Sequence, residues 1–108
     1  MKILIIDSDQ YLCNDLKSIL TKKKCSVECC FNGLDAEDFL NSNDFDLIIM
    51  DINLPKKNGI NLIKDFRKNN QTCPIIVLST TKDVKIKVET LESGADDYMV
   101  KPFDMEEM

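Results

Sequence analysis

The sequence contains no histidine and no two cysteines in the C-x-x-C spacing, so it lacks the ligand pattern of a zinc site. Its cysteines are odd in number and scattered along the chain, which also argues against a disulfide framework. We expect reduced and mostly buried thiols at Cys13, Cys25, Cys29, Cys30 and Cys73. The alternative is a redox pair of Cys29 and Cys30, although adjacent cysteines rarely reach disulfide geometry.

Long apolar runs are missing as well. No stretch approaches the roughly 20 residues that a membrane-spanning helix needs, and the opening MKILIID reaches an acid at Asp7 too soon for a signal peptide. The 19 acidic residues outnumber the 14 basic ones, and the net charge of −5 argues against nucleic-acid binding by this segment. With 108 residues, of which 44% are hydrophobic, we expect one cytoplasmic domain without membrane contact.

Five short runs predict β-strands. Three of them are continuous and apolar, as expected of strands that are buried on both faces of a sheet, namely Lys2–Ile6, 46–50 and 74–78. Two weaker candidates are Ser26–Cys30 and Asp97–Val100.

Amphipathic segments between these runs predict four helices, at 10–23, 34–41, 59–68 and 84–91. The apolar residues expected on the inner faces of the first three are Leu12, Leu16, Ile19, Leu20, Leu34, Ala36, Phe39, Leu40, Ile60, Ile63 and Phe66. The fourth segment is ambiguous, because Val84, Ile86 and Val88 alternate as in a strand whereas Val84, Val88 and Leu91 have helical spacing. The alternation of strands with helices and the stop signal at Gly94 favour a helix.

Strands that alternate with helices predict an open, parallel α/β sheet with helices on both faces. In such sheets, ligands bind beyond the carboxyl ends of the strands. The polar residues that follow the strands are Asp7, Ser8, Asp9, Asp51, Ser79, Thr80 and Lys101. We therefore expect a functional site at this edge of the sheet.

Asp7 and Asp51 would bring two carboxylates to one edge, where they repel each other unless a divalent cation such as Mg²⁺ holds them ionised. The Lys101 ammonium can pair with a carboxylate or a phosphoryl oxygen, and the Ser79 hydroxyl can hydrogen-bond a phosphoryl oxygen. This set suits phosphoryl transfer, in which an aspartate can serve as the nucleophile.

The same residues have simpler interpretations. Asp9, Ser79 or Thr80 could each be no more than a helix N-cap, and Asn58 is a further candidate cap. A lysine before proline, as at Lys101, is usually an exposed surface residue. The joint placement of these side chains after four strands is what favours a site.

The segments KILIIDSD, DLIIMDINLPKKNG, PIIVLST and GADDYMVKPF resemble the motifs of response-regulator receiver domains, most closely those of the OmpR/PhoB type. The resemblance covers the whole chain, and the pattern D-x-x-L-P-x-x-x-G followed by K-P-F is highly specific. It implies a flavodoxin-like (CheY-like) α/β fold, a doubly wound five-stranded parallel sheet with strand order 2-1-3-4-5.

The resemblance implies that Asp51 is the phosphoacceptor, that Asp7 belongs to the acid pocket, and that the backbone carbonyl of Asn53 binds Mg²⁺. The family normally has a second acid directly after the first, and this acid is the carboxylate ligand of the metal. Here that position is Ser8. We expect weaker Mg²⁺ binding, with Ser8, or Asp9 through a water, as substitute ligands.

The resemblance also implies phosphoryl contacts from Ser79, Thr80 and Lys101. Ser79 matches the switch hydroxyl that moves to the phosphoryl group, and Tyr98 matches the aromatic residue that then turns inward. The peptide bond from Lys101 to Pro102 is expected to be cis.

The chain is expected to be part of a longer protein. Receiver domains of this type continue with a fifth helix, of which 104–107 would be only the first turn. The domain 1–108 would therefore lack most of that helix and a C-terminal winged-helix DNA-binding domain. The intact protein is expected to dimerise through the face formed by 84–91, Asp97–Val100 and the fifth helix.

The leading interpretation is a two-component switch that takes a phosphoryl group on Asp51 from a sensor histidine kinase and controls DNA binding. It would be a phosphoacceptor with only self-phosphorylation and self-dephosphorylation chemistry, not an enzyme. The alternative is a phosphorylation-independent receiver that dimerises constitutively, which Ser8 supports. A third interpretation, an aspartate-nucleophile phosphatase, needs a general acid two residues after the nucleophile, where Asn53 cannot serve.

Overall fold

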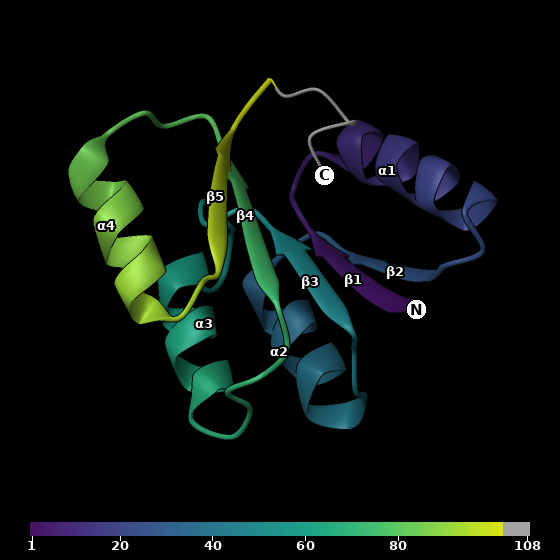
Figure 1. Cartoon of the computed structure of the whole chain (residues 1–108), viewed down its shortest axis with the longest axis horizontal. Helices are drawn as coiled ribbons and strands as arrows, with labels where there is room; N and C mark the ends of the chain where they lie inside the picture. The colour runs from purple at the N-terminus through teal and green to yellow at the C-terminus, as the bar shows by residue number, and fades with distance from the viewer. Residues whose placement is uncertain (103–108) are drawn as a thin grey trace.

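Strands and helices alternate along the chain in the computed structural model, which describes residues 1–102 (Figure 1). In chain order the elements are β1 (Lys2–Ile6), α1 (Gln10–Lys22), β2 (Ser26–Cys30), α2 (Gly33–Ser42), β3 (Leu47–Met50), α3 (Gly59–Arg67), β4 (Ile75–Ser79), α4 (Val84–Ser93) and β5 (Asp97–Val100). Each expected strand and helix is present, and its ends differ from the expected ones only by a residue or two.

The five strands form one parallel sheet in the order β2-β1-β3-β4-β5, which confirms the expected doubly wound fold. β1 lies between β2 and β3, so Ile5 pairs with both Cys29 and Ile49. The chain runs outward from β1 to β2 and then returns to build the other half of the sheet from β3. This topological switch point brings the carboxyl ends of β1 and β3 side by side, where an open sheet binds its ligands.

Helices cover both faces of the sheet (Figure 1). On one face, α1 packs its buried residues Cys13 and Leu16 against the strands. On the other face, α2, α3 and α4 contribute Ala36, Ile63 and Ile86, respectively, to a second apolar cluster. The central strands are therefore buried on both sides, as their continuous apolar runs predicted.

Asparagine and aspartate side chains cap the helices. Asp9 caps α1 and Asn58 caps α3, each by accepting hydrogen bonds from main-chain N–H groups of the first turn. The cap of α4 is Asp83, so the interpretation of Ser79 or Thr80 as the N-cap is wrong. A loop separates β4 from α4, and this loop carries the cap away from the end of the strand.

The predicted inner face of α2 is wrong at Leu34, which is 50% exposed. Gly33 faces inward instead, because a Cβ at this position would lie only 2.2 Å from the carbonyl oxygen of Lys57. Residues three apart share one face of a helix, so Gly33 and Ala36 point inward together and Leu34 is rotated toward solvent.

The helix interpretation of segment 84–91 is confirmed, and the helix ends at Gly94, whose φ of +128° suits glycine. The apolar residues with helical spacing lie on its solvent side, where Val84, Val88 and Leu91 are 70%, 45% and 36% exposed. The core is contacted instead by Ile86, on the opposite side of the helix.

Within residues 1–102, no helix has the length and apolarity needed to cross a membrane. The expected start of a fifth helix at 104–107 lies outside the described residues.

Candidate functional site

Three charged side chains meet at the carboxyl ends of β1, β3 and β5. The Nζ of Lys101 donates hydrogen bonds to Oδ2 of Asp7 at 2.7 Å and to Oδ2 of Asp51 at 2.9 Å. The exposed fractions of the side chains are 4% for Asp7, 11% for Asp51 and 16% for Lys101. The interpretation of Lys101 as an exposed surface lysine is therefore wrong.

Both the main chain and the carboxylate of Asp7 are hydrogen-bonded to neighbouring elements. Its N–H donates to the carbonyl oxygen of Cys30 in β2, and its own carbonyl accepts a hydrogen bond from the Sγ of Cys13 in α1. Its Oδ1 accepts from the main-chain N–H of Asp9 at 2.9 Å, while Oδ2 accepts from Lys101. These contacts fix the direction of the carboxylate at the end of β1.

Asp51 is anchored in a similar way but by fewer groups. Its N–H donates to the carbonyl oxygen of Ile6 at the end of β1, which aligns the two carboxylate-bearing residues. Its Oδ1 accepts from the main-chain N–H of Asn53 at 2.9 Å. The loop after β3 thus folds back on the carboxylate and brings the Asn53 backbone beside it.

The site carries one excess negative charge, because two carboxylates share one ammonium. Burial opposes the charged form of Lys101, but hydrogen bonds to Asp7 and Asp51 outweigh burial and raise the pKa of Lys101 above its ordinary value of 10.5. The lysine therefore stays protonated and pairs with both acids, and the remaining negative charge favours the binding of a cation.

The donor set fits Mg²⁺. Within residues 1–102, no three acidic, thiol or imidazole side chains come close enough to form a metal cluster. Mg²⁺ does not need such a cluster, since it is bound through one or two carboxylates and keeps several waters. The adjacent carboxylates of Asp7 and Asp51, with the main chain of Asn53 beside them, supply hard oxygen donors of this kind.

Neither substitute ligand is drawn into this pocket. Ser8 is exposed. Asp9 is exposed too, and its Oδ1 accepts from the N–H groups of Tyr11 and Leu12 at 3.0 and 3.1 Å. The interpretation of Asp9 as a helix cap is thus confirmed.

Ser79 and Tyr98 are connected through a residue between them in the chain, Thr81. Ser79 is fully buried at the end of β4, and its Oγ accepts from the Thr81 N–H at 3.3 Å. The Tyr98 hydroxyl donates to the Thr81 carbonyl oxygen at 3.0 Å, and the Tyr98 ring is buried. Thr80 is exposed, and the peptide bond from Lys101 to Pro102 is cis, the isomer that the resemblance implies.

Two residues with a role at this edge were not identified from the sequence. Cys13 could have been found, because it precedes Leu16 by three positions and therefore shares its buried face. Thr81 acts through its main chain, and no side-chain pattern indicates such a role.

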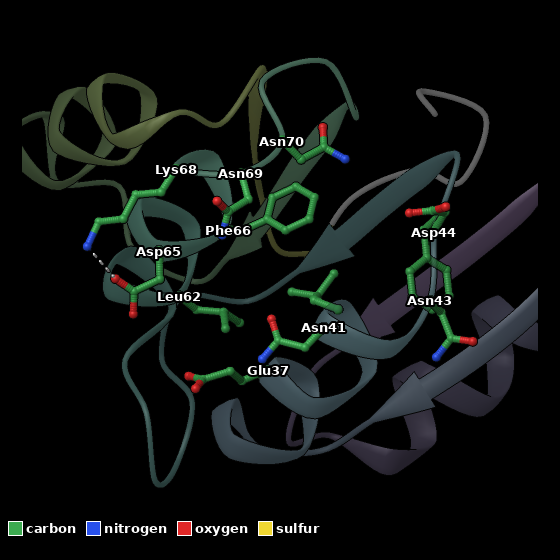
Figure 2. A pocket seen from close by; sticks show the side chains of 12 residues that line it. Glu37, Asn41, Asn43, Asp44, Leu62, Asp65, Phe66, Lys68, Asn69 and Asn70 are labelled. Atoms are coloured by element: carbon green, nitrogen blue, oxygen red, sulfur yellow. Dashed lines mark ion pairs between the residues drawn. The ribbon is translucent and has the colours of Figure 1, made fainter.

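A groove of about 480 Å³ lies elsewhere, between α2 and α3 (Figure 2). Phe45, Leu62 and Phe66 contribute apolar surface, and Glu37 and Asp65 lie among its polar lining. None of the predicted site residues lines it. The predicted site residues therefore lie apart from this groove.

The fold is that of a receiver domain. The family model described as the response regulator receiver domain matches residues 3–108, and the chain belongs to this family. The family predicted from the motifs is thereby confirmed.

Relatives and solved structures agree with this assignment. The chain is 35% identical over 108 residues to the transcriptional regulatory protein TctD of Salmonella typhimurium, and 40% identical over 107 residues to the response regulator ArlR of Staphylococcus aureus. It spans about half the length of these relatives, 48% of each. A two-component response regulator from Clostridium difficile matches with a TM-score of 0.94 and 36% identity, over 98% of this chain and 87% of that one.

Proposed function

We propose that this domain accepts a phosphoryl group on Asp51 from a sensor histidine kinase in a Mg²⁺-dependent reaction. The supporting observation is the pairing of Asp51 and Asp7 with the single ammonium of Lys101. Asp51 is fixed by its neighbours, yet 11% of its side chain stays exposed at the sheet edge, where a donor can reach it. Positioning and charge neutralisation are what phosphoryl transfer mainly requires.

In the reaction, an oxygen of Asp51 attacks the phosphorus and the bond from phosphorus to the donor's histidine nitrogen breaks, with the nitrogen keeping the electron pair. In this structure Lys101 is hydrogen-bonded to Asp51, so it is positioned to pair with a phosphoryl oxygen of the product while Asp7 keeps the Lys101 ammonium in place. Mg²⁺, held by Asp7, Asp51 and the carbonyl of Asn53, would supply further neutralisation of phosphoryl charge.

The structural change that follows phosphorylation would pass from Ser79 to Tyr98 through the main chain of Thr81. If the Ser79 hydroxyl turns toward a phosphoryl oxygen, the Thr81 N–H loses its acceptor, and the same peptide segment holds the Tyr98 hydroxyl. The loop before α4 would then rearrange together with Tyr98, which is already buried in this structure. Two packings of this loop, biased by the phosphoryl group, amount to a population shift.

In the intact protein, this change would act on a DNA-binding output domain in the cytoplasm, through a dimer formed by α4, β5 and the following helix. The support is that TctD is a transcriptional regulatory protein and is about twice as long as this chain. On this proposal the domain catalyses only its own phosphorylation and dephosphorylation, and is not an enzyme acting on other substrates.

Intact mass spectrometry after incubation with acetyl phosphate and Mg²⁺ tests the proposal. We expect a gain of one phosphoryl group, lost in Asp51→Asn and retained in the matched control Asp38→Asn, which changes an exposed aspartate of α2. A wild-type chain that gains no phosphoryl group would contradict the proposal. A gain retained in Asp51→Asn would place the acceptor elsewhere.

A second candidate function is a phosphorylation-independent interaction module. It is favoured by the exposed apolar stripe of α4, formed by Val84, Val88 and Leu91, together with the missing acid at Ser8. Sedimentation of the unphosphorylated protein would then reveal a dimer that Val88→Lys disrupts. A monomer under these conditions argues for the first function.

A further inference from the structure

Cys13 of α1 and Cys29 of β2 lie against each other on the face of the sheet that α1 covers. The Sγ of Cys29 donates a hydrogen bond to the carbonyl oxygen of Cys13 at 3.9 Å, and both side chains pack in the apolar cluster under α1. Cys13 is fully buried, whereas Cys29 is partly exposed. Cys29 is therefore the member of the pair that a small reagent can approach from solvent.

The geometry of β2 excludes the other pairing that the sequence left open, between Cys29 and Cys30. Successive side chains of a strand point to opposite faces, so Cys29 and Cys30 face away from each other. Cys30 is indeed buried in the cluster on the far face of the sheet, whereas Cys29 packs with the cluster under α1. The partner that the fold offers Cys29 is Cys13.

The pair adjoins the charged site. The thiol of Cys13 donates to the carbonyl oxygen of Asp7 at 3.4 Å, and the carbonyl of Cys30, next to Cys29, accepts from the Asp7 N–H at 3.0 Å. The main chain of Asp7 is thus held by α1 on one side and by β2 on the other. Its carboxylate in turn holds Lys101.

We propose that Cys13 and Cys29 are an oxidisable pair that a hydroperoxide converts into a disulfide between α1 and β2. Two cysteines that pack against each other across two elements, one of them partly exposed, are the arrangement that this reaction needs. Within residues 1–102, the other side-chain hydrogen bonds of the cysteines go to residues that are not cysteines.

The reaction balances in two steps. The Cys29 sulfur attacks the peroxide, the O–O bond breaks, and a sulfenic acid and one molecule of water (or alcohol) form. The Cys13 sulfur then attacks the sulfenic sulfur, and its proton leaves with the hydroxyl group as water. The two thiols together lose two electrons, which reduce the peroxide.

Burial slows the oxidation of the two thiols. It raises the pKa of Cys29, an effect that the nearby Lys17 opposes, and it raises the pKa of Cys13 to about 12. Both thiols are therefore mostly protonated at neutral pH, and the thiolate is the reacting form. The pair is a slow sensor that needs sustained exposure to oxidant.

The disulfide has a consequence at the site, which rests on the proposed function. Once oxidised, Cys13 has no S–H to donate, so the carbonyl of Asp7 loses its partner in α1. Asp7 keeps Lys101 in position, and a displaced Asp7 would slow the loading of Asp51.

The cross-link is tested by exposing the purified protein to hydrogen peroxide, blocking free thiols and mapping peptides. We expect the loss of two hydrogen atoms from the intact mass and a link between the tryptic peptides that contain Cys13 and Cys29. The link should be absent in Cys29→Ser and retained in the matched control Cys25→Ser, which changes another partly exposed cysteine. An unlinked wild type, or a link that persists in Cys29→Ser, overturns the proposal. Circular dichroism establishes that each variant is folded.

The effect on the site is measured with the same samples and acetyl phosphate. We expect the disulfide form to gain its phosphoryl group severalfold more slowly, with recovery after dithiothreitol and no change in peroxide-treated Cys29→Ser. If the link forms but the rate is unchanged, the coupling to Asp7 is wrong. If even the reduced protein gains no phosphoryl group, the proposed function fails while the cross-link stands.

Discussion

Two lysines of this domain each bridge a pair of carboxylates, and they differ mainly in how deeply those carboxylates are buried. Lys101 bridges the two aspartates of the charged site, and Lys57 bridges Glu37 of α2 and Asp65 of α3. The lysine side chains are covered to a similar extent, with 16% and 19% exposed. The carboxylates around Lys101 are 4% and 11% exposed, against 39% and 48% around Lys57.

Burial of the acids, more than the presence of an ion pair, distinguishes the charged site from the ion pairs between α2 and α3. Exposed carboxylates keep most of their hydration, so an ammonium beside them adds little stability. Buried carboxylates have lost water and depend on their partners. At the carboxyl edge, two such carboxylates share one ammonium, so a divalent cation can stabilise them further.

The largest expected effect comes from removing each ammonium while keeping its aliphatic stem. Lys101→Met leaves Asp7 and Asp51 close together without a counter-charge, and we expect a loss of about 2–3 kcal/mol in the free energy of unfolding. Lys57→Met, the matched control, should lose much less, because its acids are solvated. Urea unfolding of both variants measures the difference. Equal losses would mean that burial of the carboxylates is not what distinguishes the two sites.

A smaller effect is expected when a third acid is added to the buried site. In Ser8→Asp, the new carboxylate would stand next to Asp7 at the position where the family normally has its metal ligand. We expect Mg²⁺ to bind roughly tenfold more tightly, because ligand charge is the main determinant of affinity for hard cations. Isothermal titration calorimetry measures the change, and an unchanged affinity would mean that Ser8 does not weaken the site.

The sequence predicted the fold because its signals are local. Continuous apolar runs gave the central strands, and the caps at Asp9 and Asn58 marked two helix starts. The errors arose where packing between elements decides. Leu34 is exposed because the backbone of Lys57 leaves room only for a glycine beside it, and no pattern within α2 indicates that neighbour.

The charged site was predictable in part for a related reason. Parallel strands end at one edge, so Asp7, Asp51 and Lys101 could be placed together from their positions alone. Their pairing joins residues 94 and 50 positions apart, and its geometry depends on the register of three strands. The role of Thr81 was missed because it acts through its main chain, which carries no sequence signal, whereas the helical spacing of Cys13 to Leu16 indicated only that Cys13 is buried.

The smallest expected effect concerns the pH dependence of the exposed ion pair between Lys57 and Asp65. The hydrogen bond from Lys57, followed by its charge, lowers the pKa of Asp65 below the ordinary value of 3.8. A carboxyl whose pKa is lower in the folded state stabilises the fold at pH values above its unfolded pKa, and this contribution disappears as the pH falls through the folded value. The ion pair between Lys57 and Asp65 should therefore be intact from neutral pH down to about pH 4 and be lost below that.

Carboxyl ¹³C chemical shifts of Asp65, followed during an acid titration, measure this directly. We expect a lowered pKa in the wild type and an ordinary one in Lys57→Met, and we expect 1 M salt to reduce the difference because it screens exposed charges. If the lowered pKa persists in Lys57→Met, a group other than this lysine stabilises the Asp65 carboxylate. If it persists in high salt, Lys57 is shielded from solvent in the same way as Lys101, and the contrast between the two lysines is smaller than their carboxylate exposures imply.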